Sequence, residues 1–309
     1  MPERVRYRTL ISDSARWDGF ELRAGDIVIS TPAKCGTTWT QMICALLVFQ
    51  TDELPDSLDR LSPWLDMLTR DRDDVVADLD AQTHRRFIKT HTPYDGLPHD
   101  DGVTYICAGR DPRDVALSWD NHMLNMDLIA LFTAREAAVG NGDLAELMPD
   151  GPPLPAPTEI ERFWQWVDEP IPGGARSECL ANLVHHVSTF WSRRDAPNIL
   201  LLHYGDLEAD LDGQMRALTA QLGIPVDEER WPGLVEAATF ERMRANADRV
   251  APDTTNRLWQ DNRQFFHRGT SGQWRALLDD ADLDRYFARV AELAPDDVAR
   301  WLHRDPAYA

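Results

Sequence analysis

The chain has 309 residues, a formal net charge of −20 and 43% apolar residues. The apolar content supports a sizeable core and argues against disorder, while the acidic balance argues against a nucleic-acid partner. Residues 1–17 lack the apolar stretch of a secretory signal, and the run 42–49 is too short to span a bilayer. Four cysteines without a Cys-x-x-Cys pair are typical of a reducing compartment. We therefore expect a cytoplasmic protein.

The two basic residue types are used very unequally. Of 32 basic residues, 30 are Arg and two are Lys, namely Lys34 and Lys89. A lysine ammonium is a compact point charge on a flexible stem, whereas a guanidinium is a planar fork. A phosphate or sulfonate oxygen in a tight loop suits the ammonium. Both lysines are therefore candidate anion-binding residues.

The segment 26–49, DIVISTPAKCGTTWTQMICALLVF, predicts a strand, a tight loop and a helix. The β-branched run 27–29 is typical of a buried strand, and Pro32 cannot continue that strand. Gly36 allows the backbone to approach a ligand closely. Apolar residues at helical spacing follow from Thr37. A helix N-terminus behind such a loop offers N–H groups and a positive dipole end to a phosphate.

This loop does not have the Walker A order, because its lysine precedes its only glycine. Instead, Pro-x-Lys-x-Gly-Thr-Thr-Trp resembles the 5′-phosphosulfate loop of the cytosolic-type, family 1-like sulfotransferases. These enzymes use 3′-phosphoadenosine 5′-phosphosulfate (PAPS) as the sulfuryl donor. The resemblance implies that the loop binds this donor through Lys34, Cys35, Gly36, Thr37, Thr38 and Trp39.

The segment 85–91, RRFIKTH, predicts a second short strand that ends in a polar site. Lys89 and His91 are two positions apart, so they point to the same side of an extended strand. A nucleophilic alcohol needs a proton acceptor, and His is the usual choice near neutral pH. The segment resembles the Lys-Thr-His-x-Pro block of sulfotransferases, in which the His is the catalytic base. The resemblance implies catalytic roles for His91, Lys34 and Lys89.

A third buried strand is predicted at 103–108, and a helix begins shortly after it. Asp111 is suited to cap that helix, and the next residue is a proline, which suits the first helical position. The segment resembles the Arg-x-Pro-x-Asp-x-x-x-Ser block of the family, whose Arg and Ser hold the 3′-phosphate of PAPS. That role would belong to Arg110 and Ser118 here. The alternative for Arg110 is a surface salt bridge with Asp114.

A fourth buried strand is predicted at 198–203, followed by Tyr204, Gly205 and Asp206. The three residues after the strand resemble the Tyr-Glu-Asp block of the family, in which the Tyr contacts adenine. Gly205 replaces the usual acid. The resemblance therefore implies an adenine contact for Tyr204.

Two later segments resemble further donor-binding blocks. Residues 238–243 resemble Thr-Ser-Phe-x-x-Met, which packs on the adenine through residues matching Thr239 and Phe240, and we expect Phe240 to stack with Trp39 on the purine. Residues 267–274 resemble Arg-Lys-Gly-x-x-Gly-Asp-Trp, the second 3′-phosphate loop. This second match adds three donor-binding candidates: His267, Arg268 and Gly269. His267 stands where the family has Arg.

Two other regions carry no motif. Residues 61–80 are expected to form an amphipathic helix with Trp64 on its apolar face. Residues 124–179 contain Pro- and Gly-rich stretches at 150–156 and 170–174. Long inserts of this kind are often lids or binding loops. In the family that the chain resembles, this region covers the acceptor site, so the resemblance implies that 124–179 forms an acceptor-site insert or lid.

Strands that alternate with helices predict one α/β domain over 1–309, with a mainly parallel central sheet and helices on both faces. The resemblance implies the P-loop-NTPase-like sulfotransferase fold. Ligands of such sheets bind at the carboxyl ends of the strands, where the motifs lie. The prediction is an enzyme that moves a sulfuryl group from PAPS to the hydroxyl of a small-molecule alcohol or phenol, releasing PAP without a metal.

Two alternatives remain open at this level. One is a P-loop-like nucleotide kinase in which Asp206 serves as a Walker B acid. The other is a non-catalytic protein that binds PAP or another nucleotide without turnover. The oligomeric state and the acceptor do not follow from the sequence.

Overall fold

The computed structural model describes residues 4–148, 154–170, 178–252 and 256–304. Within this part of the chain, four strands form one sheet in the order β2-β1-β3-β4, and every neighbouring pair is parallel. The strands are β1 (Ile27–Ser30), β2 (Phe87–Thr90), β3 (Thr104–Gly109) and β4 (Ile199–His203). This confirms the predicted parallel α/β sheet.

The strand order places a topological switch point between β1 and β3. The chain passes from β1 to β2 on one side and then crosses to β3 on the other. Ile27 pairs with Phe87 on one side and with Thr104 on the other. Ligands in open α/β sheets bind outside the carboxyl ends of the strands at such a point. The loop that follows β1 and the residue that follows β3 therefore flank the expected binding crevice.

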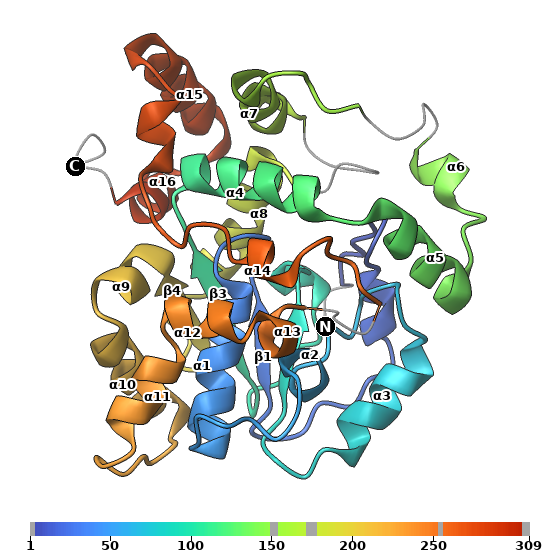
Figure 1. Ribbon diagram of the computed structural model, residues 1–309, viewed down its shortest axis with the longest axis vertical. Helices are drawn as coiled ribbons and strands as arrows, with labels where there is room; N and C mark the ends of the chain where they lie inside the picture. Colours follow the sequence, from blue (N-terminus) through green and yellow to red (C-terminus); the bar gives the residue numbers. More distant parts are fainter. Residues whose placement is uncertain (1–3, 149–153, 171–177, 253–255, 305–309) are drawn as a thin grey trace.

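The sheet is buried on both faces, as expected for parallel strands. Val28 packs in one core cluster, whereas Ile27 and Ile29 pack in the other, because successive side chains on a strand point to opposite faces. Figure 1 shows helices on either side of the strands. The first cluster includes α4 (Pro112–Asn125), α7 (Glu159–Asp168), α8 (Leu180–Trp191), α15 (Asp280–Leu293) and α16 (Asp296–His303), and the second α1 (Thr37–Phe49), α10 (Leu211–Leu222) and α11 (Trp231–Ala237).

The remaining helices and the 3-10 turns complete the described structure. They are η1 (Ser14–Trp17), α2 (Leu58–Leu61), α3 (Arg72–Ala81), η2 (Tyr94–Gly96), α5 (Leu128–Val139), α6 (Leu144–Leu147), α9 (Tyr204–Ala209), α12 (Phe240–Ala245), α13 (Ala247–Val250), α14 (Asn262–Phe265) and η3 (Gln273–Ala276). Among the helices that the structure describes, none is long and apolar enough to cross a bilayer.

The predicted helix over 61–80 is confirmed for residues 72–80 but is wrong for residues 62–71. Helix α2 ends at Leu61 and α3 begins only at Arg72, and the chain between them runs along the open edge of β2. There, Trp64 forms a bridge with Lys89, whose N–H donates to the carbonyl of Pro63 at 3.0 Å. A proline also disfavours a continuous helix. Pairing with the sheet edge therefore overrides the helical pattern and carries Trp64 to the end of β2.

Candidate active site

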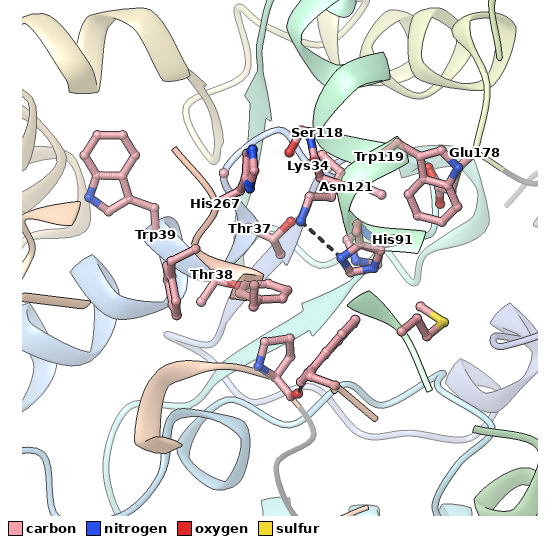
Figure 2. Close-up of a pocket in the computed structure, with 18 of the residues that line it drawn as sticks. Lys34, Thr37, Thr38, Trp39, His91, Ser118, Trp119, Asn121, Glu178 and His267 are labelled. Atoms are coloured by element: carbon pink, nitrogen blue, oxygen red, sulfur yellow. Dashed lines mark hydrogen bonds between the residues drawn. The ribbon is translucent and has the colours of Figure 1, made fainter. Parts of the chain in front are cut away.

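One cavity opens at the carboxyl ends of the strands, on the crevice side of the sheet. Figure 2 shows Trp39 at one side of this cavity, Trp119 and Glu178 at the other, and Lys34 and His91 between them. Most of the predicted site residues line it: Lys34, Gly36, Thr37, Thr38, Trp39, Lys89, His91, Arg110, Ser118, Tyr204, Phe240, His267, Arg268 and Gly269. Segments that lie far apart in the sequence thus meet in a single space.

The loop after β1 is shaped to present backbone N–H groups. Lys34 and Gly36 both adopt positive φ, at 63° and 99°. Helix α1 begins directly after Gly36 without a side-chain cap from any described residue. A Cβ atom at Gly36 would lie 3.2 Å from the ring of Tyr204, so glycine allows this close approach. The uncapped N–H groups of the first turn are suited to bind an anion.

Lys34 extends into the cavity rather than towards solvent. Its Nζ lies 3.2 Å from Nδ1 of His122 and 4.5 Å from the ring centre of Phe265, and the dashed line in Figure 2 marks the hydrogen bond to His122. Burial, followed by the charges of Arg110 and Lys89, lowers the pKa of Lys34 to about 7. An anion bound beside this amine would restore its ammonium form.

His91 has one ring nitrogen fixed and the other available. Its Nδ1 lies 2.6 Å from the carbonyl oxygen of Thr31. Because a carbonyl only accepts, Nδ1 carries the hydrogen and Nε2 is unprotonated. Burial and the charge of Lys89 hold the pKa of His91 well below its usual range. His91 is therefore a neutral imidazole whose Nε2 can accept a proton.

Lys89 occupies the same end of β2. It is buried, and its Nζ lies 4.1 Å from the ring centre of Trp64. The ring of Trp64 also meets His91 edge-on at a centroid distance of 4.7 Å. As the strand parity predicts, Lys89 and His91 both line the cavity. A base and two amines thus surround one space.

Arg110 is held at the switch point by an aromatic ring and two carbonyl groups. Its guanidinium lies 4.1 Å from the ring centre of Tyr204 and donates to the carbonyls of Lys34 and Thr270, each at 3.3 Å. The buried Nε has no hydrogen-bond partner among the described residues. Asp114 is also buried and instead accepts from two backbone N–H groups of the loop near Thr270. The alternative of a surface salt bridge is therefore wrong.

Two aromatic residues near the predicted adenine site, Trp39 and Phe240, are each held by different neighbours. Trp39 donates from Nε1 to the carbonyl of Ala238 at 2.8 Å and meets the ring of Tyr204 edge-on at 5.1 Å. Phe240 packs against Gly269, where an added Cβ would lie 2.3 Å from the ring. Both Trp39 and Phe240 line the cavity, and their stacking on a purine stays a prediction.

Thr239 contributes to the fold as a helix cap. Its hydroxyl oxygen accepts from the N–H of Arg242 at the start of α12 and donates to the carbonyl of Glu236. Thr239 does not belong to the set of residues that line the cavity. The local role of this residue is to begin the helix that carries Phe240.

Cys35 is a predicted donor-binding residue whose side chain is packed in the core. It lies in the loop beside Lys34, but its side chain is fully buried in the core cluster that contains Cys107. Burial raises the pKa of Cys35 to about 12. A thiolate at Cys35 is therefore disfavoured at neutral pH, although this residue lies beside a helix N-terminus. Cys35 does not belong to the set of residues that line the cavity, so a contact between this residue and the donor stays a prediction.

The comparisons with known proteins agree with this geometry. A family model described as the sulfotransferase domain matches residues 24–297. The chain belongs to the sulfotransferase family. Glycolipid sulfotransferases of Mycobacterium bovis and Mycobacterium tuberculosis are both 43% identical to it over 99% of this chain and 98% of theirs. Human sulfotransferase 1E1 is 26% identical over 84% of this chain and 81% of its own.

Solved structures show the same fold at lower sequence identity. A mouse sulfotransferase complexed with PAP is 20% identical, with a TM-score of 0.67, over 94% of this chain and 92% of that one. Retinol dehydratase in complex with retinol and PAP is 22% identical, with a TM-score of 0.66, over 90% of this chain and 84% of that one. The predicted sulfotransferase fold is confirmed.

The cavity of this sulfotransferase also contains residues that the motifs did not predict. His122 lies one helical turn after Ser118 on α4, and its ring packs against Trp119, Trp259 and Phe265. Burial and the charge of Lys34 hold the pKa of His122 well below its usual range. The spacing of four residues from Ser118 was the available signal, because such residues share a helix face.

Glu178 is the second unpredicted polar residue. It lies just before α8 and lines the cavity beside Trp119 (Figure 2). Burial raises the pKa of Glu178 to about 7, and a backbone hydrogen bond from Ala33 partly opposes this shift. The carboxyl group therefore connects the region 124–179 with the loop after β1. No sequence signal marks it, because its surroundings carry no motif.

No group of three or more His, Cys, Asp or Glu residues suited to hold a metal ion occurs in the described ranges. The charged groups that line the cavity include Lys34, Lys89, Arg110, Arg268 and Glu178. Anion binding in this sulfotransferase therefore has protein cations and loop amides available to it.

Proposed function

We propose that this sulfotransferase moves the sulfuryl group of PAPS to a hydroxyl of a glycolipid or a related lipid-linked small molecule. The observation that carries the proposal is the meeting of one unprotonated histidine nitrogen, two amines and an uncapped helix N-terminus at one cavity. His91 and the lysines supply a base and positive charge. The uncapped turn of α1 supplies anion-binding N–H groups.

The residues at the switch point fit the phosphates of this donor. Arg110 has a buried Nε that lacks a partner among the described residues, and Ser118 lines the same cavity. We assign the 3′-phosphate to these two residues and to the loop at Arg268 and Gly269, while the α1 turn takes the 5′ end. Burial and the charge of Arg268 lower the pKa of His267, so this residue adds a hydrogen-bonding group without a full charge.

The reaction is an in-line displacement. The acceptor oxygen attacks sulfur, the bond from sulfur to the bridging phosphate oxygen breaks, and the acceptor proton passes to Nε2 of His91. Lys34 stabilises the charge that develops on the bridging oxygen, and Lys89 together with the loop amides stabilises the sulfonate oxygens. As in phosphoryl transfer, positioning and charge stabilisation supply most of the rate enhancement.

Two observations support a lipid-linked acceptor. The 43% identical mycobacterial relatives are glycolipid sulfotransferases. The cavity also reaches a small apolar cluster, separate from the two large cores, that contains Met67, Met126, Leu131 and Leu258. A polar head carrying the hydroxyl would lie near His91, with hydrocarbon at this cluster. The four cysteines are free and buried, which fits the reducing cytoplasm that we propose as the site of action.

The kinase alternative is not favoured. It requires Asp206 as a metal-binding acid, whereas Asp206 accepts from Arg304 at 2.6 Å and is not one of the residues that line the cavity. The described residues also lack a cluster suited to a metal. A Walker B acid would instead face the phosphates.

Incubation with 35S-labelled PAPS and a panel of glycolipids, alcohols and phenols tests the proposal. We expect a labelled sulfate ester and PAP in equal amounts, with turnover that survives excess EDTA. PAP binding without a labelled ester from any acceptor would support the non-catalytic alternative. Loss of turnover in EDTA, with rescue by Mg²⁺, would support the kinase alternative.

A further inference from the structure

Exposed apolar side chains gather at the junction of α4 and α5. Four of them lie within seven consecutive positions, and we call this group the junction patch: Met123, Leu124, Leu128 and Ile129. The other large exposed apolar side chains of the described residues, Val5, Val139 and Leu154, lie apart from it in the sequence. Isolated apolar residues on a surface are ordinary, but a contiguous group often marks a binding surface.

The inner side of the same junction is part of the cavity wall. Met126 and Leu131 are buried, line the cavity and belong to its small apolar cluster. Met126 is also bridged to Trp259, another residue that lines the cavity. In Figure 1, α5 continues from the end of α4 at the edge of the molecule. One short stretch of chain therefore has apolar residues both at the acceptor side of the cavity and on the exterior.

The net charge of the protein helps to decide which class of partner the junction patch binds. The net charge of −20 would oppose docking to an anionic lipid surface, which attracts basic segments. It does not oppose contact with uncharged hydrocarbon. Leu128 of the patch lies three positions before Leu131 of the cavity cluster on α5, so the two share a side of this helix. An occupant of the cavity that carries a hydrocarbon chain therefore accounts for both features.

We propose that the junction patch binds the hydrocarbon chain of the acceptor where this chain leaves the cavity. In this proposal, the hydrocarbon chain of the acceptor extends from the apolar cluster, past Met126 and Leu131, onto Leu128 and Ile129. The inference rests on the proposed function in one respect, which is that the acceptor is lipid-linked. It adds that the protein recognises the lipid part directly, with a surface outside the reaction site.

Binding of n-alkyl β-D-glucosides tests this proposal without any need for turnover. The PAP-loaded protein is titrated by calorimetry with the methyl to dodecyl members, each below its critical micelle concentration. Affinity should rise with chain length by up to about fourfold for each CH₂ that becomes buried. Dodecyl glucoside that binds no better than methyl glucoside would overturn the proposal, whatever the outcome of sulfation assays.

A matched pair of double variants locates the contact. Leu128 and Ile129 are 46% and 83% exposed, and so are Val139 and Leu154. Leu128→Ser with Ile129→Ser should weaken binding of the dodecyl member about tenfold and leave the methyl member unchanged. Val139→Ser with Leu154→Ser should change neither. Unchanged PAP affinity in both variants verifies the fold, and equal losses of dodecyl binding in both would overturn the proposal.

A second copy of the chain is the competing occupant. Sedimentation of the parent and of the Leu128→Ser, Ile129→Ser variant over the same concentration range decides between them. We expect the two proteins to have the same oligomeric state. A parent dimer that the variant loses, together with unchanged binding of dodecyl glucoside, would assign the patch to self-association.

Discussion

The donor end and the acceptor end of the cavity are built in different ways. At the donor end, several of the residues that we assign to PAPS lie directly after a strand or at a helix start, as Arg110 and the α1 turn show. At the acceptor end, the wall comes from a helix junction, an irregular segment beside β2 and an isolated carboxyl group, Glu178. A charged ligand demands a few precisely spaced polar groups, whereas an apolar one accepts many arrangements of the same volume.

His91 lies between the two ends, and its loss should have the largest effect. His91→Ala should lower kcat by roughly 10²–10⁴, the scale of a general base, while PAP binding stays nearly unchanged. His99→Ala is the matched control, because His99 is exposed and not part of the cavity lining. Steady-state kinetics and calorimetry measure the two quantities. Full turnover in the His91 variant would remove it from the mechanism.

Lys34 tests whether the donor end requires a point charge. Lys34→Arg should be nearly as damaging as Lys34→Ala, with losses in kcat of roughly 10²–10³. In the parent, kcat/KM for PAPS should fall as the pH rises through about 7, because burial and then Arg110 and Lys89 lower the pKa of Lys34 to that value and the ammonium form is the active one. A parent-like Lys34→Arg enzyme would contradict this assignment.

Replacement of Arg110 should weaken binding of the 3′-phosphate and leave binding of the rest of the donor nearly unchanged. A charge-assisted hydrogen bond contributes roughly 1.5–3 kcal/mol, so Arg110→Ala should weaken PAP binding roughly 10- to 150-fold. AMP, which lacks the 3′-phosphate, should bind weakly to the parent. Arg110→Ala should reduce the affinity for AMP only slightly further. Ser118→Ala should weaken PAP binding less than Arg110→Ala does, because the hydroxyl group of Ser118 is neutral. Equal losses for both ligands in calorimetry would place Arg110 away from the 3′-phosphate.

Glu178 provides the corresponding test of the acceptor end. Glu178→Gln keeps the shape of the side chain but removes its ability to ionise, so we expect the acceptor KM to change by about two- to tenfold while PAP affinity is preserved. Glu169→Gln serves as the control, because Glu169 is not among the cavity-lining residues. A large loss of PAP affinity in the Glu178 variant would mean that a change at the acceptor end also alters donor binding.

The smallest effect is expected at Cys35. Burial raises the pKa of this thiol to about 12, so iodoacetamide should neither modify it nor inactivate the native enzyme at pH 8. The same reagent should label all four cysteines after unfolding in urea, which verifies the chemistry. Peptide mapping reports the modified positions. Rapid native labelling of Cys35 that PAP prevents would show that the side chain reaches the donor end.

The sequence alone determined most of the donor end and the type of sheet. Residues 27–37 carry their signal locally, because a buried strand, a chain reversal and a helix start each depend on neighbouring residues. The same holds for Lys89 and His91, which share a side by strand parity. Asp111 caps α4 as predicted, accepting from the N–H of Arg113. Short-range rules suffice where the functional groups lie within a few positions of a strand end.

Only the tertiary structure decided the acceptor end and the protonation states. The pairing of Trp64 with the edge of β2 replaced the first half of a predicted helix, and packing brought His122 within hydrogen-bond distance of Lys34. The burial that raises the pKa of Cys35 and lowers that of Lys34 comes from segments distant in the sequence. Desolvation depends on everything that surrounds a group, so it follows from the assembled fold and not from the pattern of adjacent residues.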